Sequence, residues 1–199
     1  MDGSRSIEFF DRQFEQQVRE GKTALNPFEQ AALPHLHGRL LDYGCGLGQL
    51  SLAAARAGCS VLALDGSHTA VSHLQQAAAS QGLAVDARVA DLRDHHLAET
   101  FDSIACIGLL MFFDCAAAER ALAELEAHLR PGGTLALNVL VQGTTYMDMF
   151  DPAGHCLFER DVLSRRYAPW QMISDTLSDY PAPGGLNKAF ATVIARKPR

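Results

Sequence analysis

The residues best suited to chemistry in this chain of 199 residues are the glycine-rich segment 42–48, Asp-Tyr-Gly-Cys-Gly-Leu-Gly, and Asp65. Three alternating glycines let a backbone turn sharply and approach a ligand where a Cβ atom would collide. Asp65 ends the apolar run 61–64 and follows Gly44 by 21 residues. At that spacing an acidic side chain at the tip of the next strand can reach a ribose diol. The pattern of strand, turn, helix, strand and acid therefore predicts a site for a nucleotide-type cofactor.

The details of the glycine segment indicate which cofactor is bound. A dinucleotide-binding turn would carry a third glycine at position 49, where this chain has Gln49. Gly-x-Gly-x-Gly with an aspartate two residues earlier resembles the first motif of the class I S-adenosylmethionine-dependent methyltransferases. In that family the acid after the third strand commonly bonds adenine, and the segment after the fourth contacts the cofactor through its backbone. The resemblance implies S-adenosylmethionine as cofactor, held by Asp42, Gly44, Cys45, Gly46, Gly48, Asp65, Gly66, Asp91, Leu92, Ile107 and Gly108.

Composition narrows the class of protein. The chain is 48% hydrophobic with a net charge of −6, and it has no basic run, which argues against nucleic acid as a partner. Its apolar stretches are of strand length, so we expect no membrane span and no signal peptide. Five scattered cysteines without metal-ligand spacing predict reduced thiols, no metal site and a cytoplasmic location. The expected partner is a small-molecule acceptor, and both monomer and homodimer remain open.

Alternating apolar segments predict a single α/β domain over residues 1–199. Segment 1–38 is expected to form helices that lie over the site as a lid, and segment 39–199 the α/β core. We expect a doubly wound, Rossmann-like, mostly parallel seven-stranded sheet with helices on both faces and a C-terminal antiparallel hairpin. The expected strands are 39–43, 60–65, 85–89, 102–107, 134–141, 169–179 and 189–197. The expected helices are 6–20, 27–35, 49–57, 68–81, 115–130 and 159–165.

Further segments resemble the tellurite-resistance methyltransferases. They are Phe9-Phe10-x-x-x-Phe14, Leu110-Met-Phe-Phe113, the stretch 159–170 and the terminal stretch 190–197. The chain departs from that group at 184–188, where Asn187 stands in place of a histidine and Lys188 in place of an arginine. The resemblance implies a soft anionic acceptor such as tellurite, a selenium species or a thiolate. Candidate acceptor-site residues are Asn187, Lys188, Arg165 and Arg166.

Three alternatives remain open at this level. One is a generic small-molecule O- or N-methyltransferase, and another is a module that binds S-adenosylmethionine without catalysis. A third is an NAD-dependent oxidoreductase, against which Gln49 and the helices ahead of the first strand both count. No residue in the sequence requires a general base.

Overall fold

The computed structural model describes residues 5–21, 24–152 and 154–199. Helices and strands alternate along most of this length, as expected for an α/β fold. The strands are β1 (Arg39–Tyr43), β2 (Ser60–Asp65), β3 (Val85–Val89), β4 (Phe101–Ile107), β5 (Leu129–Leu140), β6 (Gln171–Ala182) and β7 (Leu186–Arg196). The helices are α1 (Arg5–Arg19), α2 (Pro27–Ala32), α3 (Gln49–Arg56), α4 (His68–Gln81), α5 (Cys115–His128) and α6 (Val162–Tyr167), with 3₁₀ turns η1 (Leu33–His35), η2 (Leu110–Phe112) and η3 (Pro183–Gly185).

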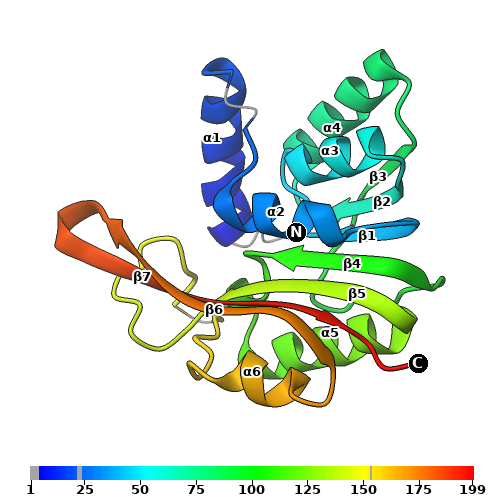
Figure 1. Cartoon of the computed structure of the whole chain (residues 1–199). Coiled ribbons are helices and arrows are strands. Elements are labelled where there is room, and N and C mark those ends of the chain that lie inside the picture. The colour runs from blue at the N-terminus through cyan, green and yellow to red at the C-terminus, as the bar shows by residue number, and fades with distance from the viewer. Residues whose placement is uncertain (1–4, 22–23, 153) are drawn as a thin grey trace.

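The seven strands form one sheet in the order β3-β2-β1-β4-β5-β7-β6 (Figure 1). The first five run parallel, whereas β7 pairs antiparallel with both β5 and β6. The strand order reverses direction between β1 and β4, and ligands in such sheets bind beyond the carboxyl ends of the strands at that point. This confirms the predicted doubly wound sheet with its C-terminal antiparallel hairpin.

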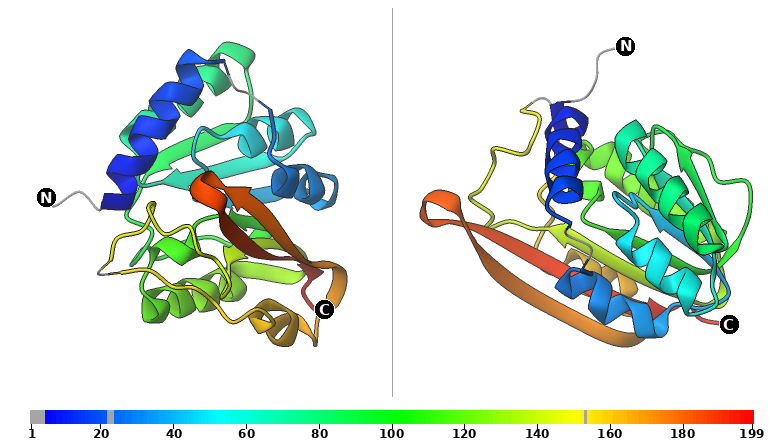
Figure 2. Two further views of the ribbon diagram at one scale, coloured as in Figure 1. Left: turned by 90° about the vertical axis from the view of Figure 1, so that its left-hand side faces the viewer. Right: turned by 90° about the horizontal axis from the view of Figure 1, so that it is seen from above.

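Helices cover both faces of the sheet (Figures 1 and 2), because the central strands are apolar on both sides. On one face, α3 and α4 pack against β1 and β2 through a core that includes Leu50, Leu74 and Val61. On the other face, α5 packs against β5 and α6 against β7, through a core that includes Leu122 and Leu125 of α5. The site lies along one edge of this rigid scaffold.

Local signals in the sequence account for several element boundaries. The side chains of Asn26, Ser67 and Asp114 cap the N-termini of α2, α4 and α5, and Gly82 ends α4 in a left-handed conformation. Strand β5 begins at Leu129 rather than at the expected residue 134. Leu129 pairs with β4 while the following Pro-Gly-Gly segment bulges before the regular register resumes.

Several other boundaries also differ from those expected. Helix α5 ends at His128 rather than 130, and the last helix spans Val162–Tyr167 rather than 159–165. The hairpin strands β6 and β7 are longer than expected and project from the body of the molecule (Figure 1). Backbone bonds from Thr145 and Tyr146 to the carbonyl of Asn187 tie this hairpin to the loop after β5.

The prediction of reduced thiols is wrong for two of the five cysteines. Cys115, at the start of α5, and Cys156, in the loop after β5, form a disulfide with Cα atoms 4.8 Å apart. The two residues are 41 positions apart in sequence, so only the packing of that loop against α5 reveals the pair. Cys45, Cys59 and Cys106 are free and buried.

Within the described ranges, no helix combines the length and the apolarity needed to cross a membrane. The same part of the chain holds no group of three His, Cys, Asp or Glu residues arranged for a metal ion.

Candidate functional site

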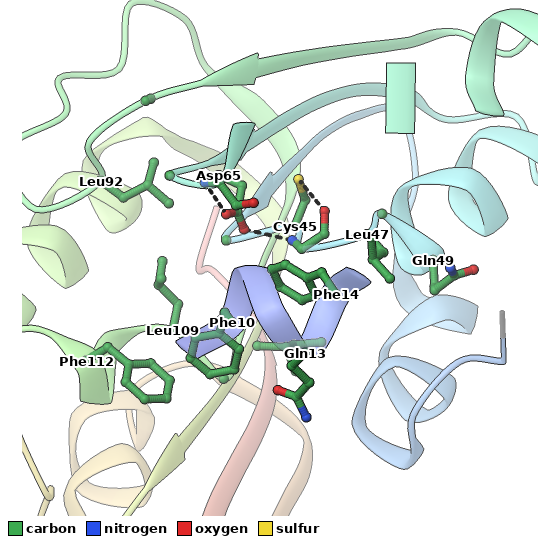
Figure 3. A pocket seen from close by; sticks show the side chains of 18 of the residues that line it. Phe10, Gln13, Phe14, Cys45, Leu47, Gln49, Asp65, Leu92, Leu109 and Phe112 are labelled. Carbon is green, nitrogen blue, oxygen red and sulfur yellow. Dashed lines mark hydrogen bonds between the residues drawn. The ribbon is translucent and has the colours of Figure 1, made fainter. Parts of the chain in front are cut away.

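A cavity of about 740 Å³ opens beyond the carboxyl ends of the parallel strands, between them and α1 (Figure 3). Its walls come from the turns after β1, β2, β3 and β4 and from α1 and α2. All of the cofactor candidates from the sequence line this cavity except Asp42. This volume is within the usual range for ligand pockets, which is roughly 300–1,000 Å³.

The glycine turn is shaped by contacts that only glycine permits. Gly44 and Gly48 have φ angles of +83° and +74°, in the left-handed region that disfavours other residues. A Cβ atom on Gly48 would lie 2.4 Å from the side chain of Leu74, and one on Gly44 would lie 2.9 Å from Leu109. The amide of Gly44 donates to the carbonyl of Leu64 at 2.8 Å, which fastens the turn to the end of β2.

Asp65 ends β2 and faces the glycine turn (Figure 3). Its carboxylate accepts hydrogen bonds from the backbone amides of Gly46 at 2.8 Å and Ser67 at 2.9 Å. Burial raises the pKa of Asp65, while these two amides act in the opposite direction. The amides therefore hold the carboxylate in one orientation at the cavity wall.

Asp91, after β3, lies in a more solvated part of the cavity wall. Its carboxylate pairs with Arg93 at 3.0 Å, and this partner lowers the pKa of Asp91. Arg93 also lines the cavity. Sequence reasoning did not identify Arg93, because an arginine two residues after an acid is common in surface turns.

Asp42 lies outside the cavity lining, although it belongs to the glycine motif. It is 5% exposed, and its carboxylate accepts a hydrogen bond from the Ser51 hydroxyl at 2.6 Å. Burial raises the pKa of Asp42 to about 7, with Ser51 opposing the shift and the nearby carboxylates Glu29 and Asp65 adding to it. The structure therefore buries, next to the glycine turn, a carboxyl group whose ionisation is disfavoured.

Helix α1 forms one wall of the cavity with Phe10, Gln13, Phe14 and Gln17 (Figure 3). The ring of Phe10 meets that of Phe112 edge-on, with centroids 4.9 Å apart. A hydrogen bond from the Ser67 hydroxyl to Asp11 joins α1 to the start of α4.

These contacts arise from the aromatic spacing at the start of the chain and from η2, which follows β4. The sequence indicated that α1 could cover the site, but it did not single out Phe112 or Glu29, which also lines the cavity. Glu29 stands three residues after the cap Asn26, and that spacing signals a helix start rather than a ligand site.

The loop after β5 supports the aromatic wall from behind. Phe150 of this loop contacts Phe112, with ring centroids 5.2 Å apart, and stacks on His155. The disulfide at Cys156 and a backbone bond from Cys156 to Met111 hold the loop against η2.

None of the four acceptor-site candidates from the sequence lines the cavity. Arg166 is paired with Glu126 at 2.6 Å and with Glu119 at 2.7 Å, both of which belong to α5. Arg165 is paired with Glu159 and with Asp161. Both arginines therefore anchor the region around α6.

The two hairpin candidates also have local partners. The Lys188 ammonium lies over the ring of Tyr146, 4.7 Å from its centroid, and burial lowers the pKa of Lys188. The side-chain amide of Asn187 donates to Asp179 at 3.1 Å. The three cationic acceptor-site candidates, Lys188, Arg165 and Arg166, therefore all contact other residues of the chain and do not line the cavity.

Fold and site together define an α/β protein of the class I methyltransferase type. The glycine turn after β1, the acid after β2 and the acid after β3 follow neighbouring strands and line one cavity, which is the arrangement that the methyltransferase resemblance implies for an adenosyl cofactor. A Cβ atom on Gly108, after β4, would meet no neighbouring atom within 4 Å, so the backbone there is open for close approach.

Comparisons with known proteins agree with this fold. Residues 40–133 match a family model described as a methyltransferase domain. The chain is 32% identical over 185 residues to the ubiquinone biosynthesis O-methyltransferase of Xylella fastidiosa (strain 9a5c), covering 74% of each chain. The chain therefore belongs to the S-adenosylmethionine-dependent methyltransferases, and its cofactor is S-adenosylmethionine.

The chain is also similar to a second curated protein and to a solved structure, but these similarities support less, because one covers only part of the relative and the other has low sequence identity. The chain is 30% identical over 175 residues to Hemagglutinin 1 of Eikenella corrodens, covering 80% of this chain but 55% of that protein. The crystal structure of TehB from Haemophilus influenzae superposes with a TM-score of 0.77 over 91% of this chain and 65% of TehB. At 19% identity the TehB likeness shows the fold alone. Family membership sets aside the NAD-dependent oxidoreductase alternative.

Proposed function

We propose that this chain methylates a small, largely apolar amine at nitrogen, using S-adenosylmethionine. The observation that carries the proposal is the character of the cavity wall, which presents aromatic rings and, among the described lining residues, no cationic side chain without a partner. Phe10, Phe14 and Phe112 supply the rings, and the arginine of the lining, Arg93, is paired with Asp91.

The electrostatics favour a neutral or cationic acceptor over an anionic one. Among the described residues that line the cavity, Arg93 is the only lysine or arginine, and Asp91 engages its charge. An anionic acceptor would be desolvated in this cavity without a free cationic partner, which is unfavourable. An alkylammonium product, by contrast, is stabilised by aromatic faces.

The kinds of base available in the cavity also favour nitrogen. The described lining residues include no histidine, tyrosine or lysine, and their carboxylates, Glu29, Asp65 and Asp91, already accept hydrogen bonds from backbone amides or pair with Arg93. When bound, S-adenosylmethionine supplies a methyl group already activated by its sulfonium charge. An amine free base attacks through its lone pair and can release its proton to water afterwards, whereas a phenol would need deprotonation first. The residues of this chain then have to position the acceptor and exclude water.

The soft anionic acceptor implied by the tellurite-resistance resemblance has less support. An anionic acceptor needs a cationic partner, and the cationic acceptor-site candidates Lys188, Arg165 and Arg166 are engaged elsewhere. The O-methyltransferase alternative retains the same cofactor site but needs a base from the acceptor or from solvent.

A binding assay followed by a turnover panel tests the proposal. Calorimetry should show binding of S-adenosylmethionine and S-adenosylhomocysteine, and no binding of NAD. Release of S-adenosylhomocysteine should then be fastest with an aryl-substituted secondary amine, compared with matched phenols and thiols, tellurite and selenite. The rate should rise with pH as the amine loses its proton. Turnover of tellurite or a thiol alone would refute the nitrogen assignment, and binding without turnover of any acceptor would indicate a non-catalytic module.

A further inference from the structure

Glu29 occupies an unusual position, because it serves as a helix cap and also lines the cofactor cavity. One carboxylate oxygen, Oε2, accepts a hydrogen bond from the Asn26 backbone amide at 2.7 Å, completing the capping box of α2. Within the described part of the chain, the other oxygen, Oε1, has no hydrogen-bond partner. The cap fixes the carboxylate in place and leaves one oxygen free to bind a ligand.

The other acidic groups at the cavity are already engaged. Asp65 accepts from two backbone amides, and Asp91 is paired with Arg93. Asp42 is buried beneath the glycine turn and bonded to Ser51. Among the described lining carboxylates, Glu29 is therefore the one with an oxygen that has no hydrogen-bond partner, since both oxygens of Asp65 and of Asp91 accept at least one bond.

The topology places Glu29 at the end of the cavity opposite the adenine side. Asp91 follows β3 and Asp65 follows β2, while the glycine turn follows β1. Helix α2 lies further along the same row, where Ala32 packs against Ala136 of β5 and Ile194 of β7. The charge of Glu29 also contributes to the raised pKa of Asp42, which immediately precedes the glycine turn.

We infer that Glu29 binds the α-ammonium group at the amino-acid end of the cofactor. The inference rests on the proposed function, since it needs an adenosyl amino acid in the cavity. An ammonium group is a point charge with three donors, and a half-buried carboxylate with a free oxygen is the partner it requires. Burial raises the pKa of Glu29 and so disfavours its ionised form. A cation bound beside the carboxylate would act in the opposite direction and favour ionisation.

The test variant is Glu29→Gln, because glutamine retains the acceptor oxygen of a capping box and removes only the charge. The control is Asp175→Asn, the same carboxylate-to-amide change at an exposed residue of β6 that does not line the cavity. Both variants should keep the wild-type circular dichroism and melting profile. Calorimetry is then performed with S-adenosylmethionine, S-adenosylhomocysteine and 5′-methylthioadenosine, the last of which lacks the amino acid.

Glu29→Gln should weaken both amino-acid-bearing ligands to a similar extent, by roughly 10- to 100-fold, the range of a charge-assisted bond. It should leave methylthioadenosine affinity within about twofold, and Asp175→Asn should change none of the three. Equal losses for all three ligands would mean a structural role, and a loss confined to S-adenosylmethionine would place Glu29 at the sulfonium; either result overturns the inference. If wild-type protein bound none of these ligands, the proposed function itself would fail.

Discussion

Replacing Asp42 by asparagine should make the cofactor-free protein more stable above neutral pH. Asp42 is 5% exposed, and burial raises its pKa from an ordinary 3.8 to about 7. Between these values the folded protein holds a proton that the unfolded chain releases. Stability therefore falls as pH rises from about 4 to about 7, and the cost stays constant at higher pH.

The size of the effect follows from the two pKa values. Since a tenfold change in an equilibrium constant is about 1.4 kcal/mol, ionising Asp42 costs the folded state about 4 kcal/mol at pH 8. At pH 5 the corresponding cost is about 2 kcal/mol, because the folded side chain remains protonated while the unfolded one is ionised. Asparagine keeps the acceptor for the Ser51 hydroxyl but adds a buried amide donor, a penalty of roughly 1–3 kcal/mol that does not vary with pH.

The informative quantity is therefore the change in the stability difference with pH. Relative to wild type, Asp42→Asn should gain roughly 2–3 kcal/mol between pH 5 and pH 8. For a domain of this size that gain corresponds to a relative shift in Tm of roughly 5–10 °C. Urea unfolding at pH 5, 6.5 and 8, without cofactor, measures it directly.

Ser51→Ala serves as the companion variant for this experiment. It removes the hydroxyl bond that favours the ionised carboxylate, so it should steepen the loss of stability with rising pH. A stability difference between Asp42→Asn and wild type that stays flat from pH 5 to pH 8 would refute the reasoning, because it would mean that Asp42 titrates as in water. The stabilised variant should bind the cationic cofactor more weakly, which would explain why the site keeps an unfavourable acid.

Other expectations concern separate parts of the site. Asp65→Ala should weaken S-adenosylmethionine by about 30-fold or more, since two charge-assisted bonds to ribose are worth roughly 2–4 kcal/mol; unchanged affinity in calorimetry would contradict the ribose assignment. Reducing the bond between Cys115 and Cys156, which closes a span of 41 residues, should lower the unfolding free energy by about 4 kcal/mol. Titration of five free thiols without reductant would show that this bond does not form. Phe10→Ala removes the ring contact with Phe112 and should lower kcat/KM by roughly 3- to 10-fold with little change in Tm; a loss of stability without a kinetic effect would indicate that the ring only packs.

The sequence by itself determined the cofactor half of this protein. The strands β1 to β3 match the expected bounds, because their apolar runs are bounded by turn residues within a few positions. The glycine turn and Asp65 were recognisable for the same reason: both depend on local backbone geometry and on a fixed spacing between consecutive strands. The caps Ser67 and Asp114 also act within one helical turn, so short-range patterns identified them.

Only the tertiary structure decided the acceptor half. Arg166 and Lys188 are engaged by partners about 40 residues away in sequence, which no local pattern reports, whereas Arg165 pairs with Glu159 and Asp161 close to it in the chain. The partnership of Cys115 with Cys156 likewise depends on how a long loop packs.

Glu29 combines a role that the local sequence indicates with one that only the tertiary structure reveals. Its capping role is visible three residues from Asn26, whereas its place in the cavity wall depends on how α2 packs across the sheet. Local propensity and spacing act over a few residues, but a binding surface assembles side chains from several segments. For that reason the identity of the cofactor was accessible from the sequence, while the character of the acceptor pocket required the fold.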